Sequence, residues 1–176
     1  MGEDRRTRKT MAAIHSAMIE CLQTTPIEKV TVKQICDVAD INRSTFYVYY
    51  QDQMMLYQQL ENEFLQKLDS VMFNLHANNT SYDEHLRDIV HCYSENDMLY
   101  MTMLKSRSKV FKAAQGQFIE KYHFMDSIIK NSDRALALEY YTDGINGVIS
   151  SWIEGGKKQS EEYIASFLYK LTKSQF

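Results

Sequence analysis

The segment from Thr31 to Tyr50 carries polar side chains whose types and spacing suit hydrogen bonding to DNA. An arginine at position 43 can donate two hydrogen bonds in a fork to guanine N7 and O6, and neighbouring hydroxyl groups suit base edges or phosphate oxygens. The residues of this segment that are predicted to contact DNA are Thr31, Asn42, Arg43, Ser44, Thr45, Tyr47 and Tyr49. The chemistry that this segment indicates is recognition by hydrogen bonds and not catalysis.

Two short helices joined by a tight turn are predicted to position these side chains. Thr31 can cap the first helix, and the polar residues of Asp40-Ile41-Asn42 interrupt it before Asn42 caps the second. Phe46 and Tyr50 lie four residues apart, which places both on the inward face of the second helix. This is the helix-turn-helix pattern, in which the second helix enters the DNA major groove.

A looser group of possible metal ligands occurs in the second half of the chain. Asp88, His91 and Cys92 fall at i, i+3 and i+4 on one helix face, and His85 and His123 lie elsewhere. Metal sites normally need three or four ligands, and the chain has neither an HExxH motif nor paired CxxC motifs. We therefore expect no metal, no cofactor and no enzymatic activity.

The residues before the helix-turn-helix predict a first helix that continues to about Thr24. Its N-terminal end is a basic arm that either contacts phosphates or is simply solvated, and the arm consists of Arg5, Arg6, Arg8 and Lys9. With the two short helices it forms a three-helix bundle. Residues 1–50 hold seven basic and six acidic side chains, so the DNA hypothesis rests on local placement of charge and not on bulk charge.

A long helix is predicted after the bundle, without a flexible linker. Asp52 can cap it, and apolar residues repeat at threes and fours from Leu56 to Leu75. The chain has one Pro, and no Gly between Gly2 and Gly116, which favours an all-α fold. We predict a helix-turn-helix DNA-binding domain at residues 1–50, joined by this helix to a second helical domain at residues 51–176.

The helix-turn-helix segment resembles the DNA-binding domain of TetR-family (tetracycline-repressor-like) regulators. The resemblance is carried by Thr31, Ile35-Cys36, Ala39, Ile41-Asn42-Arg43-Ser44-Thr45-Phe46-Tyr47, Tyr49-Tyr50 and Leu56. The family usually has Gly where this chain has Asp40 and a phosphate-binding Lys where it has Gln53, so the resemblance adds Gln53 to the predicted DNA contacts. The run from Gly144 to Leu171 is more weakly similar to the C-terminal half of one Gram-positive-type subgroup. The resemblance implies that residues 51–176 form an effector-binding and dimerisation domain. In it the last two helices would form the dimer, a ligand pocket would lie in the second half, and the long helix would act as a lever.

Two sets of residues in the second half follow from the apolar pattern and the resemblance together. Methionine and aromatic side chains are expected either to fill the core or to line an effector pocket; the predicted lining is Met98, Met101, Phe111, Phe118 and Tyr122. Large apolar side chains on the last two helices either pack internally or pair two copies of the chain. The predicted dimer interface is Tyr141, Ile145, Val148, Ile149, Trp152, Ile164, Phe167, Leu168 and Leu171.

Composition is that of an ordinary globular protein. The 176 residues are 44% hydrophobic and 24% charged, with a net charge of −3. Cys21, Cys36 and Cys92 show no paired spacing, so we expect buried reduced thiols and a cytoplasmic location. No apolar run approaches the length of a signal peptide or a membrane span, so no membrane association is expected.

These patterns together favour a homodimeric regulator, most simply a repressor, that binds a double-stranded DNA operator. A small-molecule effector in the second half would bias the tilt of the long helix and so the separation of the two recognition helices. One alternative is a regulator of the same fold that is controlled by a protein partner. The other is a helical binding protein with little DNA affinity. This alternative is favoured by Asp40, by Gln53 and by the nearly neutral charge of residues 1–50.

Overall fold

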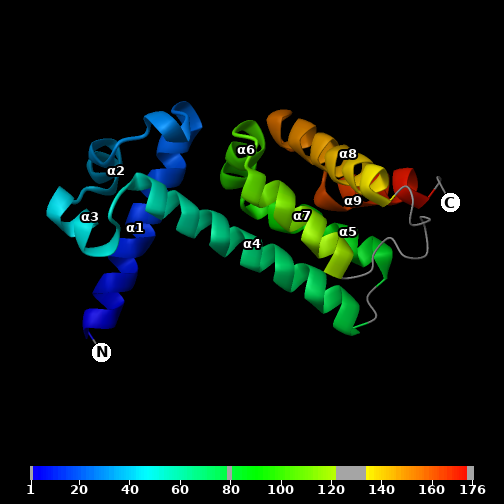
Figure 1. The fold of residues 1–176 in the computed structure, drawn as a ribbon, viewed down its shortest axis with the longest axis horizontal. Coiled ribbons are helices and arrows are strands. Elements are labelled where there is room, and N and C mark those ends of the chain that lie inside the picture. Colours follow the sequence, from blue (N-terminus) through cyan, green and yellow to red (C-terminus); the bar gives the residue numbers. More distant parts are fainter. Residues whose placement is uncertain (1, 79–80, 122–133, 174–176) are drawn as a thin grey trace. The chain divides into compact units, whose positions relative to one another are not determined.

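The computed structural model describes residues 2–78, 81–121 and 134–173, and within these ranges every regular element is helical (Figure 1). This confirms the predicted all-α class. The chain divides into two compact units. The first unit contains the residues up to Glu63 and Met98–Ser106, and the second contains Phe64–Asp97 and the chain from Arg107 onward. None of the helices in the described ranges is long and apolar enough to cross a membrane.

The first unit is built around three helices at the start of the chain. They are α1 (Gly2–Thr24), α2 (Val32–Ala39) and α3 (Arg43–Tyr49), with a 3-10 turn at Ile27–Lys29 behind Pro26. Helix α2 packs against both α1 and α3. The unit also takes in the start of α4 (Gln53–Asn78) and most of α6 (Asp97–Lys105). Its fully buried side chains include Ile14, Met18, Ile35, Phe46, Tyr50 and Leu56.

Helix α4 begins where the sequence predicts. The Asp52 carboxylate accepts a hydrogen bond of 2.8 Å from the Met55 backbone N–H, which satisfies one of the unpaired donors of the first turn. The helix then runs without interruption to Asn78, so it contributes residues to both units.

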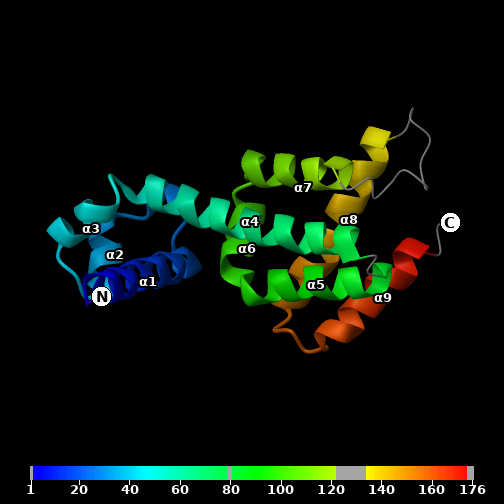
Figure 2. The same ribbon diagram turned by 90° about the horizontal axis from the view of Figure 1, so that it is seen from below.

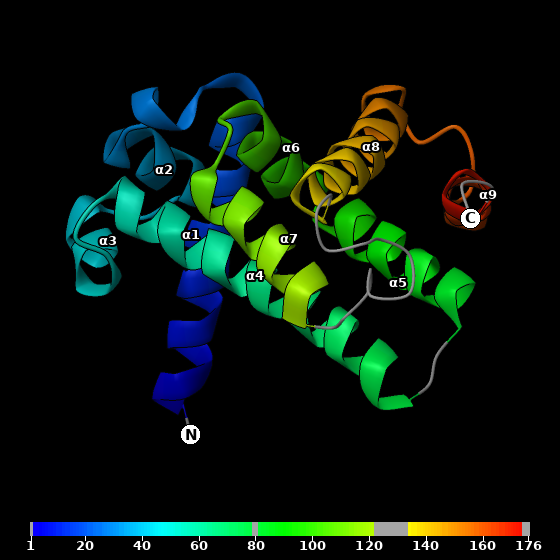
Figure 3. The ribbon, with the colours of Figure 1, turned by 45° about the vertical axis from the view of Figure 1, so that its right-hand side comes forward.

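The second unit consists of the rest of α4 together with α5 (Tyr82–Glu95), α7 (Lys109–Lys121), α8 (Arg134–Glu154) and α9 (Glu161–Lys173). Helix α9 packs across α5 (Figure 2), and this is the most extensive contact between two helices of the unit. Helix α8 contacts α5, α7 and α9 (Figure 3). The buried core of the unit includes Phe64, Leu86, Val90, Phe111, Ile149 and Leu168.

The turn between α8 and α9 explains why α9 returns to α5. Gly156 and Lys157 adopt left-handed backbone with φ of 81° and 52°, which ends α8 as expected of a glycine pair. The Lys157 ammonium then donates to the Ser94 carbonyl at 2.8 Å and pairs with the Asp97 carboxylate at 2.6 Å. Trp152 Nε1 donates to the Gln159 carbonyl at 2.9 Å. These contacts fix the start of α9 beside the end of α5.

Candidate nucleic-acid interface

Helix α2 starts and stops through local hydrogen bonds. Thr31 accepts from the Gln34 backbone N–H at 3.3 Å, while the Gln34 side chain accepts from both the backbone N–H and the hydroxyl of Thr31. This reciprocal arrangement is a capping box. At the other end Asp40 is left-handed, with φ 52° and ψ 48°, and its N–H bonds the Cys36 carbonyl. The exposed hydroxyl of Thr31 is therefore engaged in capping α2.

Asn42 organises the start of α3. Its side-chain oxygen accepts from the Thr45 backbone N–H at 2.8 Å, from the Thr45 hydroxyl at 2.9 Å and from the Ser44 hydroxyl. The predicted cap is confirmed. Ser44 and Thr45, which the sequence suggests as base or phosphate contacts, here use their hydroxyl protons to hold the cap. Their positions fix the first turn of the helix.

The inward face of α3 is anchored more strongly than the sequence suggests. Phe46 and Tyr50 are buried as predicted, and their rings lie 5.7 Å apart between centroids. The Tyr50 hydroxyl lies 2.7 Å from Nε2 of His15 on α1, and His15 Nδ1 lies 3.8 Å from the Glu63 carboxylate on α4. Burial lowers the pKa of His15, although the nearby Glu63 charge opposes that effect. Sequence reasoning missed His15 because its partner is 35 residues away.

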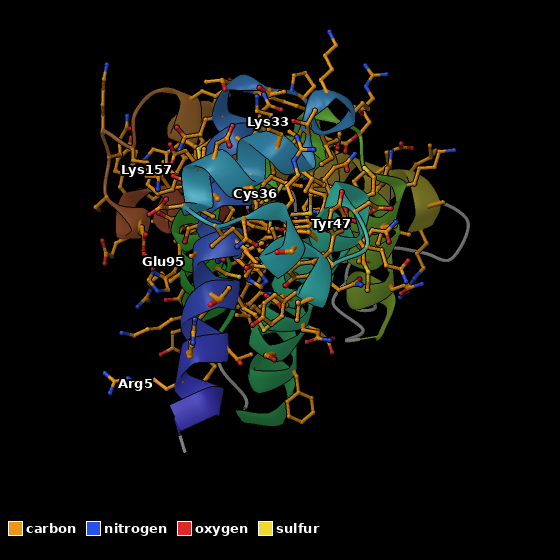
Figure 4. The ribbon with its side chains drawn as sticks, turned by 90° about the vertical axis from the view of Figure 1, so that its left-hand side faces the viewer. Arg5, Lys33, Cys36, Tyr47, Glu95 and Lys157 are labelled. Atoms are coloured by element: carbon orange, nitrogen blue, oxygen red, sulfur yellow. The ribbon has the colours of Figure 1, made fainter. Side chains whose placement is uncertain are left out.

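The outward face of α3 is open to solvent. Arg43 is exposed, Tyr47 is 56% exposed and Val48 is 75% exposed. Figure 4 looks onto α2 and α3 and labels Lys33 and Tyr47 on them. Tyr49 and Gln53, also predicted to contact DNA, are half-buried. The structure therefore separates the eight predicted residues into exposed groups, capping groups and half-buried groups.

The basic arm forms the first turns of α1. Arg5 extends away from the helix into solvent (Figure 4), and the other basic side chains of the arm, Arg6, Arg8 and Lys9, are also exposed. Exposed cations at the start of a helix in the same unit as α3 are suited to phosphate oxygens.

The predicted effector residues do not all fall in one unit. Met98 and Met101 lie on α6 in the first unit, whereas Phe111 lies on α7 in the second. Phe111 is buried in an aromatic cluster, with ring centroids 6.1 Å from Phe64 and 6.4 Å from Tyr93. Phe118 also lies on α7, and Tyr122 falls outside the described residues.

A buried polar network lies beside the aromatic cluster and shares Tyr93 with it. The sequence pattern did not reveal this network. The side-chain amides of Gln115 on α7 and Asn146 on α8 donate to each other, both at 3.0 Å. Gln115 Nε2 also donates to the Tyr93 hydroxyl at 3.0 Å. Burial raises the pKa of Tyr93, so the phenol stays protonated. The network links α5, α7 and α8 through polar contacts in the interior of the second unit.

The predicted dimer residues divide into buried and exposed groups. The buried ones hold α8 and α9 inside the second unit, and they are Tyr141, Ile149, Trp152, Ile164 and Leu168. Phe167 and Leu171 are exposed at 41% and 46%, and Ile145 and Val148 are half-buried. Other apolar side chains of these helices are also exposed, namely Leu136, Tyr140 and Tyr163. The exposed apolar residues of α8 and α9 are therefore the ones available to a second copy of the chain.

A family model covers most of the second half of the chain. Residues 80–174, more than half of the chain, match TetR_C_8, which is described as a transcriptional regulator C-terminal region. The chain belongs to the TetR family of transcriptional regulators. This regulator is consequently a DNA-binding protein and not an enzyme, and the resemblance seen in its first third is confirmed by an independent match in its second half. No curated protein sequence matches the chain significantly.

Solved structures share the fold. A TetR transcriptional regulator from Streptococcus agalactiae is 22% identical, with a TM-score of 0.67 and 97% of each chain covered. The regulator FadR from Bacillus subtilis, solved with stearoyl-CoA, is 14% identical, with a TM-score of 0.69 and coverage of 94% of this chain and 98% of its own. The dihydroxyacetone kinase operon activator DhaS is 21% identical, with a TM-score of 0.59 and coverage of 94% and 95%.

Proposed function

We propose that this TetR-family regulator binds a double-stranded operator as a homodimer through the outward face of α3, and that it acts as a repressor. Residues 1–50 would bind DNA, and residues 51–176 would carry dimerisation and effector binding. The observation that carries the proposal is the division of α3 into a buried anchor, Phe46 and Tyr50, and an exposed face with Arg43 and Tyr47. A short helix held rigidly from behind can present its outer side chains to a groove.

The roles within the interface follow from these positions. Arg43 is exposed, and its guanidinium suits guanine N7 and O6. Tyr47 presents a hydroxyl that suits a phosphate oxygen. Tyr49, Gln53 and the basic arm of α1 would add backbone contacts, which position the protein without reading sequence.

Operator binding can be measured by gel shift with the DNA upstream of the regulator's own gene at several salt concentrations. Wild-type protein should bind specifically at moderate salt and weaken steeply as salt rises, because phosphate contacts release counterions. Arg43→Ala and Tyr47→Ala should each lose specific binding while keeping the helical circular dichroism of the wild type. Arg87→Ala, which alters an exposed arginine of α5, is the matched control. Undiminished specific binding by Arg43→Ala would refute the role of that residue.

The dimer face that we propose is the exposed side of α8 and α9. Leu136 and Tyr140 lie one turn apart on α8, and a Cβ added at Gly144 or Gly147 would meet no atom within 4 Å. On α9 the corresponding exposed apolar residues are Tyr163, Phe167 and Leu171. Five large apolar side chains exposed on two adjacent helices favour burial against a second copy. Such a pair would offer two α3 helices to one operator.

We further propose that an effector binds within the second unit and alters the tilt of α4. The aromatic cluster around Phe111 supplies apolar surface, and the amides of Gln115 and Asn146 supply polar groups that could orient a ligand. Because α4 is one helix from Gln53 to Asn78 and belongs to both units, it is the natural element to carry a change toward α3. DNA accepts two recognition helices only near one helical turn apart, about 34–36 Å, or a multiple of it.

Stearoyl-CoA is a reasonable first probe for the effector, since it accompanies the structure of a regulator with the same fold. Added to the operator complex in the gel shift, it should release the DNA, whereas coenzyme A alone should not. The same titration with Phe111→Leu should need more of the compound. Unchanged DNA affinity at saturating stearoyl-CoA would exclude this class of effector.

A further inference from the structure

Val48 is the most exposed large apolar side chain of α3, at 75%. The buried face of the same helix is formed by Phe46 and Tyr50, so Val48 contributes little to the core of the first unit. Valine is also a weaker helix former than alanine, arginine or lysine, by roughly half a kcal/mol per residue. Neither core packing nor helix propensity therefore explains an exposed valine in this helix of seven residues.

The surroundings of Val48 on the outward face are polar. Ser44 lies one turn earlier, with its hydroxyl turned toward Asn42, and Tyr47 and Arg43 provide the exposed hydrogen-bonding groups. Val48 thus presents a small apolar area among groups that donate hydrogen bonds. A polar base edge placed against these methyl groups would lose its water without gaining a partner, which costs free energy.

The major groove offers one apolar group among its base edges, the methyl on C5 of thymine. We propose that Val48 contacts the 5-methyl group of a pyrimidine in each operator half-site and so contributes to sequence specificity. The chemistry is shared by thymine and 5-methylcytosine. This inference rests on the proposed operator binding through α3, and it adds an apolar contact to the hydrogen-bonded readout assigned to Arg43.

Replacement of thymine by deoxyuridine tests the contact, because it removes only the methyl group. Once footprinting has located the operator, each thymine is replaced in turn, symmetrically in both half-sites, and binding is measured by fluorescence anisotropy. At one position the replacement should weaken wild-type binding by about fourfold per half-site, the effect of one buried methyl group. Val48→Ala should bind the thymine and deoxyuridine operators equally well. At the same position cytosine should bind more weakly than 5-methylcytosine.

Val38→Ala is the matched control, since Val38 is an exposed valine on α2. It should keep the wild-type penalty for deoxyuridine. Specific wild-type binding that is insensitive to deoxyuridine at every position would overturn the inference and leave the proposed function standing, as would a penalty that persists in Val48→Ala. A wild-type protein without specific binding to any upstream fragment would instead overturn the proposed function and this inference together.

Discussion

The backbone conformation of Asp40 has a cost in stability. Its backbone is left-handed, a conformation that a Cβ disfavours, and its carboxylate sits at the C-terminal, electronegative end of α2. We predict that Asp40→Gly raises the free energy of unfolding by about 0.5–1 kcal/mol. Urea denaturation followed by circular dichroism measures the change.

The control for Asp40→Gly is the same substitution three residues earlier. Asp37 is exposed within α2, where glycine costs backbone entropy, so Asp37→Gly should lower the free energy of unfolding by roughly 0.5 kcal/mol or more. Equal effects of the two variants would contradict the argument from backbone conformation.

His85 predicts a pH dependence of stability. Burial lowers its pKa to about 3, whereas the unfolded chain should titrate near 6.5. Below pH 6.5 the unfolded state therefore binds a proton that the native state does not. The free energy of unfolding should be highest above pH 6.5 and should decrease as the pH is lowered from there. The loss should reach about 2 kcal/mol at pH 5, and His85→Phe should remove most of it.

His91 has the opposite sign and provides the comparison. Its hydrogen bond of 2.9 Å to Glu161 raises its pKa, so its contribution is present below pH 6.5 and lost as pH rises. His91 is largely exposed, so solvent screens this ion pair and its effect on stability should be small. Urea midpoints from pH 7.5 to 5 should fall in His91→Gln much as in wild type. A fall of the same size in His85→Phe would show that another group is responsible.

At the scale of helices, two substitutions of the cap residue Asn42 should affect stability and operator binding differently. Asn42→Ala removes the acceptor for the Thr45 N–H and should cost about 1 kcal/mol of stability. Asn42→Asp keeps an acceptor and should retain stability, but its negative charge would face DNA phosphates and weaken operator binding. Thermal melts and gel shifts on both variants test this. Strong operator binding by Asn42→Asp would place Asn42 away from the DNA.

Helix starts were predictable from sequence because their partners lie a few residues away. Asp52 caps α4, as predicted. The Glu84 carboxylate likewise accepts from the N–H and hydroxyl of Ser81, which lies only three residues earlier. The exposed and buried faces of α3 also followed from spacing, because Phe46 and Tyr50 define one side of a short helix. Each of these features is determined by residues within about one helical turn of each other.

Contacts between distant helices were not predictable in the same way. Helix α8 has apolar side chains on both sides, with Tyr140 exposed and Tyr141 buried, so its pattern does not specify which face lies inward. The amide pair of Gln115 and Asn146 joins residues 31 positions apart. Such pairings depend on how whole helices pack, which no local spacing records.

At the scale of the whole molecule, the exposed face of α8 and α9 predicts the oligomeric state. Phe167→Glu places a charge in the proposed interface and should give monomers at micromolar concentration with weaker operator binding. Sedimentation equilibrium measures the mass. Val110→Glu makes the same change at an exposed apolar position on α7 and should remain dimeric. A dimeric Phe167→Glu protein would move the interface elsewhere.

The chain's three cysteines have a practical consequence for spectroscopy. All three are buried, and burial raises the pKa of each thiol, that of Cys92 to about 11. Because the thiolate is the reactive form, a maleimide at neutral pH should leave them largely unmodified and label an added surface cysteine such as Gln51→Cys. Spin labels at this position in both copies of a dimer would then report the distance between the two recognition helices, and none of the native cysteines would need to be replaced.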